Sequence, residues 1–312
     1  MHAQRSYQND EDYWRIRAFL RTLYLLNNRI EYSWQAYRFD YWRWHGVENI
    51  DHFSLSNVVW LWETNDGQIA AVLNPESRGQ AFLHIHPASQ SPDLIAEMLF
   101  VAERYIALQT AGGKRKLTVW AVAEDAIRKA SLTSAGYHQT PFQEMMRRRP
   151  IEELVPKVEL QPGFRVHSLG YGAEFLDRCY ASGLAFHPDD INQAVQYRTD
   201  PGWYHNIQRA PLYRRDLDLV VTDEAGAVAA FCTVWFDDVT RTGAFEPVGT
   251  IPKYQRQGLG KVLMHEGLRR LQHLGATRAT VGSYEEPAHR LYQAVGFRDY
   301  TLNQAWLKEW QE

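Results

Sequence analysis

The chain has 312 residues, of which 45% are hydrophobic and 23% charged, a composition typical of a folded globular protein and a length that suggests two domains. A formal net charge of −3 gives no basic face for nucleic acid, and the absence of any apolar run of about 18 residues argues against a membrane partner. Because Cys179 and Cys232 are the only cysteines and the N-terminus is no signal peptide, we expect a cytoplasmic protein without a disulfide framework.

The first unusual segment is an aromatic-rich run at residues 32–45, in which Arg38 and Arg43 stand at helical spacing. Packing in a core or against another domain explains such a run more simply than ligand binding does.

The next elements make a regular series. We predict strands at 58–63, 68–73, 82–87 and 116–122, a hairpin turn at 65–67, a helix at 92–109 and a short helix ending at Gly136. His84 and His86 alternate with apolar residues on one of these strands, and zinc would need two further ligands that are not nearby at usual spacing. We therefore expect no metal site.

The second half of the chain repeats this plan. We predict strands at 217–222, 227–232, 246–251 and 277–283, a turn at 223–226, a helix at 259–274 and a short helix that begins near Glu285 and ends at Gly296. Gly67 and Gly226 lie 159 residues apart, and Gly136 and Gly296 lie 160 apart, so two anchors share nearly one offset. The pattern predicts a duplication, with domains at 1–150 and 164–312 joined by a Pro-rich, charged linker at 151–163.

The halves differ at one loop. Residues 255–261 read Gln-Arg-Gln-Gly-Leu-Gly-Lys between a strand and a helix, and Gly258 and Gly260 allow close approach to the main chain. The unpaired N–H groups that begin a helix form a site for phosphate or pyrophosphate. After Pro87 the first half has no glycine in the equivalent stretch, and Pro92 follows a capping Ser91.

This loop, followed by Leu-Tyr-x-x-x-Gly-Phe at 291–297, resembles the GNAT superfamily of N-acetyltransferases over residues 164–305. The duplication extends the resemblance to tandem GNAT proteins of the mycothiol synthase type. It implies an α/β (α+β) fold of two tandem domains, each a mixed, mostly antiparallel sheet flanked by helices. The first domain would be a degenerate copy without a CoA site.

The resemblance also implies the chemistry. Acetyl-CoA would be the co-substrate, and a primary amine of a small molecule or peptide would attack it directly in a ternary complex. The residues implied to bind acetyl-CoA are Val248, Gly249, Thr250, Gln255, Arg256, Gln257, Gly258, Leu259, Gly260, Lys261, Glu285 and Ala288. Glu285 stands where the family usually has Asn, and Gly249 could equally be an ordinary strand glycine.

Two residues are candidates for catalysis. Tyr292 matches the family's general acid, which protonates the CoA thiolate, although a half-buried core tyrosine would give the same pattern. Glu246 is the best candidate for the base that takes the amine proton. Its rivals are Glu285, Glu286, Asp237, Asp238 and a chain of water molecules.

Two other functions remain compatible with the sequence. The chain could be a non-catalytic acyl-CoA-binding or interaction module, or it could use a longer donor such as succinyl-CoA. The acceptor loops at 183–216 are rich in aromatic and charged residues, which excludes few amines.

Overall fold

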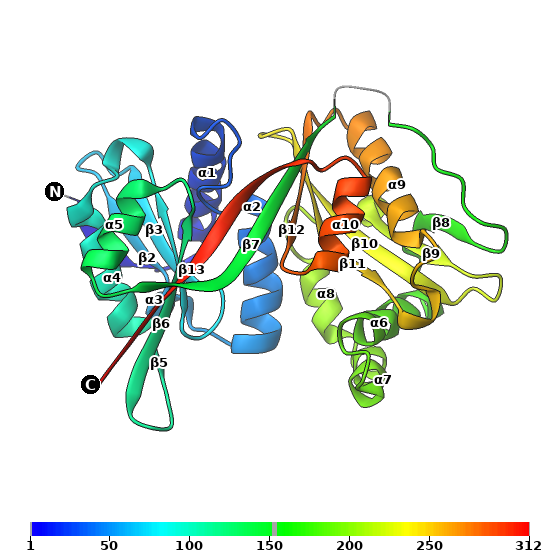
Figure 1. Cartoon of the computed structure of the whole chain (residues 1–312), viewed down its shortest axis with the longest axis horizontal. Helices are drawn as coiled ribbons and strands as arrows, with labels where there is room; N and C mark the ends of the chain where they lie inside the picture. The colour runs from blue at the N-terminus through cyan, green and yellow to red at the C-terminus, as the bar shows by residue number, and fades with distance from the viewer. Residues whose placement is uncertain (1, 152–154, 312) are drawn as a thin grey trace. The chain divides into compact units, whose positions relative to one another are not determined.

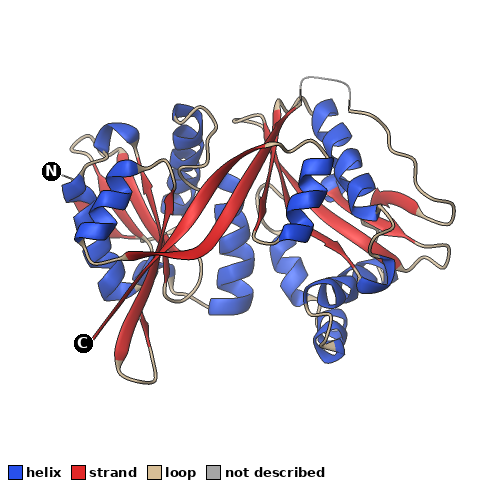
Figure 2. Cartoon of the chain, in the orientation of Figure 1, coloured by secondary structure: helices blue, strands red, loops and turns tan. Residues whose placement is uncertain are grey.

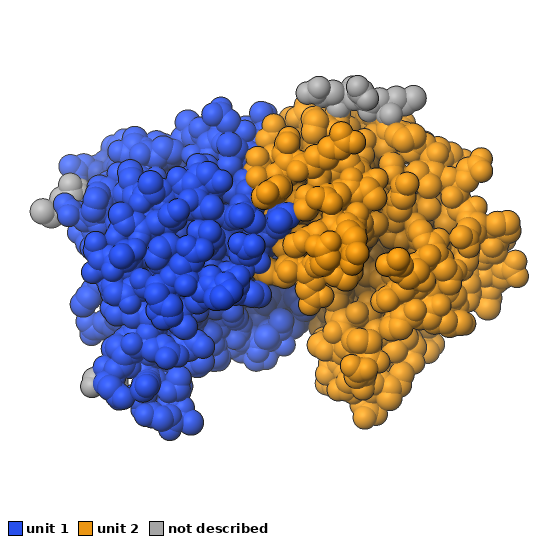
Figure 3. Space-filling model, viewed as in Figure 1, with its two compact units in different colours: residues 1–145, 301–312 blue, residues 146–300 orange. Residues whose placement is uncertain are grey.

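The computed structural model describes residues 2–151 and 155–311. The chain forms two compact units: unit 1 comprises Met1–Met145 and Thr301–Glu312, and unit 2 comprises Met146–Tyr300 (Figure 3). Part of the predicted linker, residues 152–154, lies outside the described residues. No helix in the described ranges is both long and apolar enough to cross a membrane.

Unit 1 is built on a mostly antiparallel sheet (Figure 1). In spatial order its strands are β1 (Ala3–Ser6), β2 (Trp60–Glu63), β3 (Ile69–Pro75), β4 (Gln80–Ile85), β6 (Lys114–Val122) and β13 (Asp299–Gln311), with β5 (Leu108–Gln109) paired to β6. Only β4 and β6 run parallel among these neighbours, with Gln80 opposite Thr118.

Helices cover both faces of this sheet (Figure 2). They are α1 (Asp10–Leu26), α2 (Ala36–Tyr41), the π-helix η1 (Trp42–Asp51), α3 (Leu55–Val58), the 3-10 turn η2 (Pro87–Ser89), α4 (Pro92–Tyr105) and α5 (Ala126–Ser134). Leu73 and Leu83 belong to the core cluster that contains α4, whereas their neighbours Val72 and Phe82 belong to the cluster that contains α1. Successive residues of each strand therefore pack in cores on opposite faces of the sheet, because side chains alternate along a strand.

The aromatic run predicted to pack in a core does so. Trp34, Phe39 and Trp42 are at least nine-tenths buried and belong to the cluster that α1 covers. The guanidinium of Arg38 lies over the rings of Trp34 and Phe82, 5.2 and 5.3 Å from their centroids.

Unit 2 repeats the arrangement. Its sheet has the order β12 (Arg278–Ser283), β11 (Thr242–Thr250), β10 (Val228–Asp237), β9 (Asp218–Thr222) and β8 (Arg165–Ser168). Its helical elements are α6 (Ala173–Phe186), α7 (Ile191–Thr199), α8 (Gly202–Gln208), η3 (Arg215–Leu217), η4 (Pro252–Tyr254), α9 (Leu259–His273) and α10 (Glu286–Ala294). The strands and helices of both units form the predicted α/β fold, in which β11 and β12 are the parallel pair of unit 2.

Two strands, β7 (His138–Pro150) and β13, have residues in both units. The last strand, β13, pairs antiparallel with β6 from Asn303 opposite Val122 to Gln311 opposite Lys114, so residues 301–312 belong to unit 1 instead of the contiguous 164–312 domain we predicted. In the other direction, β7 runs into unit 2, where the N–H of Ile151 donates to the carbonyl of Thr277 at 2.9 Å. Pairing satisfies the backbone of β6, which would otherwise be an exposed edge.

The predicted helix at 92–109 is too long. It ends at Tyr105, and Leu108 and Gln109 pair with Lys116 and Arg115 as a short strand. The predicted strand at 58–63 also starts later, at Trp60, because residues 55–58 form one helical turn.

Candidate functional site

A cavity of about 560 Å³ opens in unit 2 where β11 leads through η4 into α9. Its wall brings together residues from five segments of one unit: Ala185 and Phe186 of α6, Val248, Gly249 and Thr250 of β11, Tyr254, Gln255, Arg256 and Gly258 of the loop, Leu259, Gly260 and Lys261 of α9, and Pro287, Ala288, Arg290, Leu291 and Tyr292 of α10. Most of the residues predicted to bind the co-substrate are therefore on one wall.

The strand β11 leaves its main chain open at this wall. Its pairing with β12 extends from Thr242 only to Ala244, so among the described residues the cavity residues Val248, Gly249 and Thr250 have no strand partner on that side. On the other side, Val248 pairs with Cys232 but Phe245 pairs with Val234, which is a β-bulge at residues 246–247. A bulge beside a site re-aims the side chains it contains.

The start of α9 offers main-chain donors. Gly258 takes a left-handed φ of +80° as the N-cap, and its carbonyl accepts the first helical hydrogen bond from Val262 at 3.1 Å. The N–H groups of Leu259, Gly260 and Lys261 therefore precede the first helical bond, at the positive end of the helix dipole. The side-chain amide of Gln255 donates to the carbonyl of Thr250 at 3.2 Å, which holds the loop against the strand.

Gly249 is required for packing, whether or not it also contacts the co-substrate. A Cβ at this position would lie 2.2 Å from the ring of Phe231 on β10, so the missing side chain makes room for a core aromatic. The glycine lines the cavity with its backbone while its empty side faces the core.

We expect Gly249→Ala to lower the free energy of unfolding by about 2 kcal/mol, because the ring of Phe231 must move. The measurement is chemical denaturation of the two proteins. Adding Phe231→Leu should recover part of the loss, and a variant as stable as the parent would contradict the contact.

Tyr292 sits on α10 with 7% of its surface exposed and its side chain on the cavity wall. Burial, and to a smaller extent electrostatic interaction with Glu246, raises the pKa of Tyr292 well above its ordinary value. The phenol therefore stays protonated at neutral pH and can act as a donor.

Three predicted residues are not on the wall. Gln257 donates its amide to the carbonyl of Lys253 at 3.5 Å, and Glu285 is the N-cap of α10 without a side-chain capping bond. Glu246 lies in the bulge, partly buried, and its carbonyl accepts from the indole N–H of Trp235 at 2.6 Å. Its charge nevertheless reaches Tyr292.

Several wall residues were not predicted. Leu291 lies one turn after Ala288 on α10, and Pro287 lies one turn before Leu291, so helical spacing alone could have found them. Arg290 adds a third cation to the wall beside Arg256 and Lys261. Tyr254 donates its hydroxyl to Asp223 at 2.5 Å, which fixes the start of the loop.

The equivalent helix start in unit 1 is closed. The side chain of Ser91 accepts from the N–H of Leu94 at 3.2 Å, and Pro92 has no N–H to offer. On the preceding strand His84 is buried, and burial lowers its pKa to about 3. Its ring is held by the N–H of Trp34 and the side chain of Asn74. The described residues contain no cluster of three His, Cys, Asp or Glu side chains that could hold a metal ion.

Comparisons with known proteins agree with this arrangement. Residues 183–297 match the model of the acetyltransferase (GNAT) family, whereas comparison with curated proteins gives no match. Among solved structures, a GCN5-related N-acetyltransferase from Sphaerobacter thermophilus has a TM-score of 0.65 at 16% identity, covering 99% of this chain and 95% of that one.

Two further structures resemble the whole chain. A tandem GNAT protein from the clavulanic acid biosynthesis pathway has a TM-score of 0.66 at 13% identity, covering 99% of this chain and 98% of that one. A GNAT-family acetyltransferase from Colwellia psychrerythraea has a TM-score of 0.61 at 11% identity, covering 98% and 100%. These likenesses confirm the predicted tandem fold.

Proposed function

We propose that unit 2, in which residues 183–297 match the model of the acetyltransferase (GNAT) family, transfers an acetyl group from acetyl-CoA to a primary amine of a small molecule or peptide. The observation that carries this proposal is the cavity of about 560 Å³, in which residues 248–250 of β11, beyond its pairing with β12, meet a helix N-terminus and a protonated phenol. The helix start is open in unit 2 and closed by Ser91 and Pro92 in unit 1, so we expect one catalytic centre in the chain.

The start of α9 would hold the co-substrate by its pyrophosphate. The N–H groups of Leu259, Gly260 and Lys261 provide the donors, and a helix N-terminus favours an anion. Arg256 and Arg290 add positive charge on the same wall. A Cβ at Gly258 would meet no protein atom within 4 Å, so it would project into the open space through which a ligand reaches these N–H groups. The glycine leaves that space free.

The open edge of β11 would hold the acyl end of the co-substrate. Main-chain N–H groups near Val248 would stabilise the negative charge that develops on the acyl oxygen during attack. Tyr292 would donate its proton to the leaving sulfur, and Glu246, or water that it orients, would take the proton of the amine. Phe186 brings an aromatic side chain, half of it exposed, to the same cavity and would contact the acceptor.

The decisive experiment compares two glycine variants. Gly258→Ala should weaken acetyl-CoA binding about tenfold in calorimetry and slow CoA release with an amine panel, because its methyl enters the phosphate site. Gly226→Ala is the matched control, since Gly226 has φ +84° and the same open surroundings on the β9–β10 turn.

Each result then has a meaning. Equal binding by both variants would contradict the phosphate site. Binding of acetyl-CoA without transfer to any amine would favour the non-catalytic module, and preference for succinyl-CoA in competition would change the donor.

A further inference from the structure

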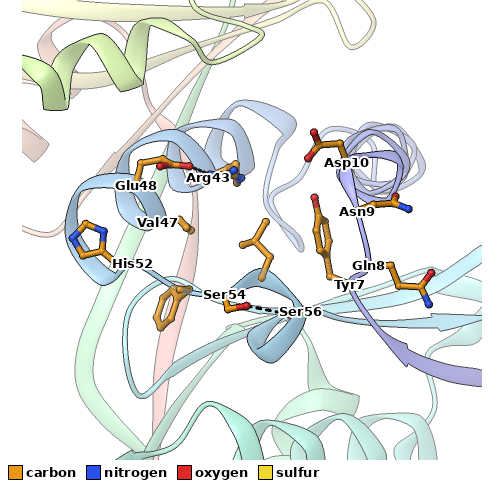
Figure 4. Close-up of a pocket in the computed structure, with 12 residues that line it drawn as sticks. Tyr7, Gln8, Asn9, Asp10, Arg43, Val47, Glu48, His52, Ser54 and Ser56 are labelled. Atoms are coloured by element: carbon orange, nitrogen blue, oxygen red, sulfur yellow. Dashed lines mark hydrogen bonds and ion pairs between the residues drawn. The ribbon is translucent and has the colours of Figure 1, made fainter.

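Unit 1 contains a cavity of about 530 Å³ that the proposed acetyl transfer does not use (Figure 4). Its wall comes from the residues between β1 and α1, from η1 and from the residues that lead into α3. It lies beyond Ser6 of β1, which pairs with Trp60. The loop after β4 begins at the opposite end of the sheet, where the main-chain N–H of His86 donates to the carbonyl of Ala70. The cavity is therefore not a remnant of the lost CoA loop.

The π-helix η1 supplies one side of the cavity. A π-turn is longer than an α-turn, so residues four or five apart share a face, and Arg43, Val47, Glu48 and the C-cap His52 all line the wall. Arg43 and Glu48 form an ion pair across one such turn. Turns of this kind are rare and occur frequently at functional sites.

Tyr7 supplies a donor that the protein itself does not use. Only 6% of the residue is exposed, and its hydroxyl makes no hydrogen bond of normal geometry among residues 2–151 and 155–311, although the nearby carboxylate of Asp10 adds to the effect of burial in raising its pKa. Figure 4 shows the ring beside the cavity with the hydroxyl toward the side of Asp10. A buried donor without a partner destabilises the fold by about 1–3 kcal/mol unless a bound molecule satisfies it.

The polar groups of the wall come in pairs of a donor and an acceptor. Asp10 lies near Tyr7 without a hydrogen bond of normal geometry, Arg43 forms an ion pair with Glu48, and the hydroxyls of Ser54 and Ser56 are 3.1 Å apart. An alcohol both donates and accepts, so it can engage both members of such a pair. An ammonium group only donates, so it would offer no acceptor to the hydroxyl of Tyr7. A phosphate would need a cation, and Arg43 is already paired with Glu48.

We infer that unit 1 binds a polyhydroxy compound of monosaccharide size in this cavity. Val47, Phe53 and Leu55 give the wall an apolar part against which the C–H face of such a molecule packs. The degenerate unit is then a ligand-binding module, and its site is independent of acetyl-CoA.

Ligand-observed NMR of the full chain with myo-inositol and with D-glucose tests this inference. We expect at least one of them to bind with a dissociation constant of about 1 mM and Tyr7→Phe to weaken it about tenfold, which corresponds to one hydrogen bond. Tyr7→Phe removes a hydroxyl that has no internal partner, so its thermal stability should not fall. Ser54→Ala is a second variant on the rim and should weaken binding as well.

Tyr105→Phe is the control, because Tyr105 is an exposed tyrosine of the same unit outside the cavity. Failure of both polyols to bind at about 50 mM would overturn the inference. So would binding of inorganic phosphate or propylamine in their place, or a Tyr7→Phe variant that binds as tightly as the parent.

Discussion

Tyr292→Phe should lower kcat about 100-fold while leaving the KM for acetyl-CoA nearly unchanged, because a positioned general acid typically contributes at least that factor to the rate. The substitution removes only the hydroxyl. The aromatic ring remains to pack against Phe297, whose centroid lies 6.5 Å away. Single-turnover measurements of CoA release isolate the chemical step from product release.

The pH dependence separates an acid from a packing residue. Because burial raises the pKa of Tyr292, its proton is retained to higher pH than in an ordinary tyrosine, and the parent should show no loss from phenol ionisation up to about pH 10. Tyr171→Phe, at a residue that is 78% exposed, controls for loss of a hydroxyl in the same unit. If Tyr292→Phe turns over like the parent across the whole pH range, the acid role is wrong.

The loop at 255–261 could be predicted because its signals are local. Pro252 stops the strand, Gly258 adopts the left-handed φ that a helix start needs here, and α9 begins at Leu259, where we predicted it. A few consecutive residues thus specify this loop and the start of α9, and a short-range pattern is sufficient to predict them.

The assignment of residues 301–312 to unit 1 could not be predicted in the same way. The pairing of Trp306 with Val119 joins residues 187 positions apart, and no turn or motif in β13 indicates which strand it pairs with. The contact that requires a glycine at 249 could not be predicted either, because Phe231 lies on another strand. Arg290 and Tyr254 reach the cavity only through the three-dimensional arrangement of α10 and the loop.

Glu246→Gln should reduce kcat/KM about 100-fold at pH 7, and the deficit should shrink as the pH rises. A primary amine with a pKa of about 10.4 is neutral about once in 2,500 at pH 7, so deprotonation costs about 4.6 kcal/mol there and nothing above that pKa. A base in the bulge of β11 removes this cost only where the amine is charged. Rates with one amine between about pH 7 and pH 10 measure the effect.

The other carboxylates make matched controls for this prediction. Asp237→Asn, Asp238→Asn, Glu285→Gln and Glu286→Gln neutralise the rival candidates one at a time. The carbonyl of Glu246 keeps its bond to Trp235 in the Gln variant, so the bulge should persist and the melting temperature should not change. A deficit that is equal at every pH would indicate a structural effect. If one of the rival variants instead has a low rate at pH 7 that approaches the parent's rate as the pH rises, that carboxylate is the base. Only the group that takes the amine proton becomes dispensable once the amine is neutral.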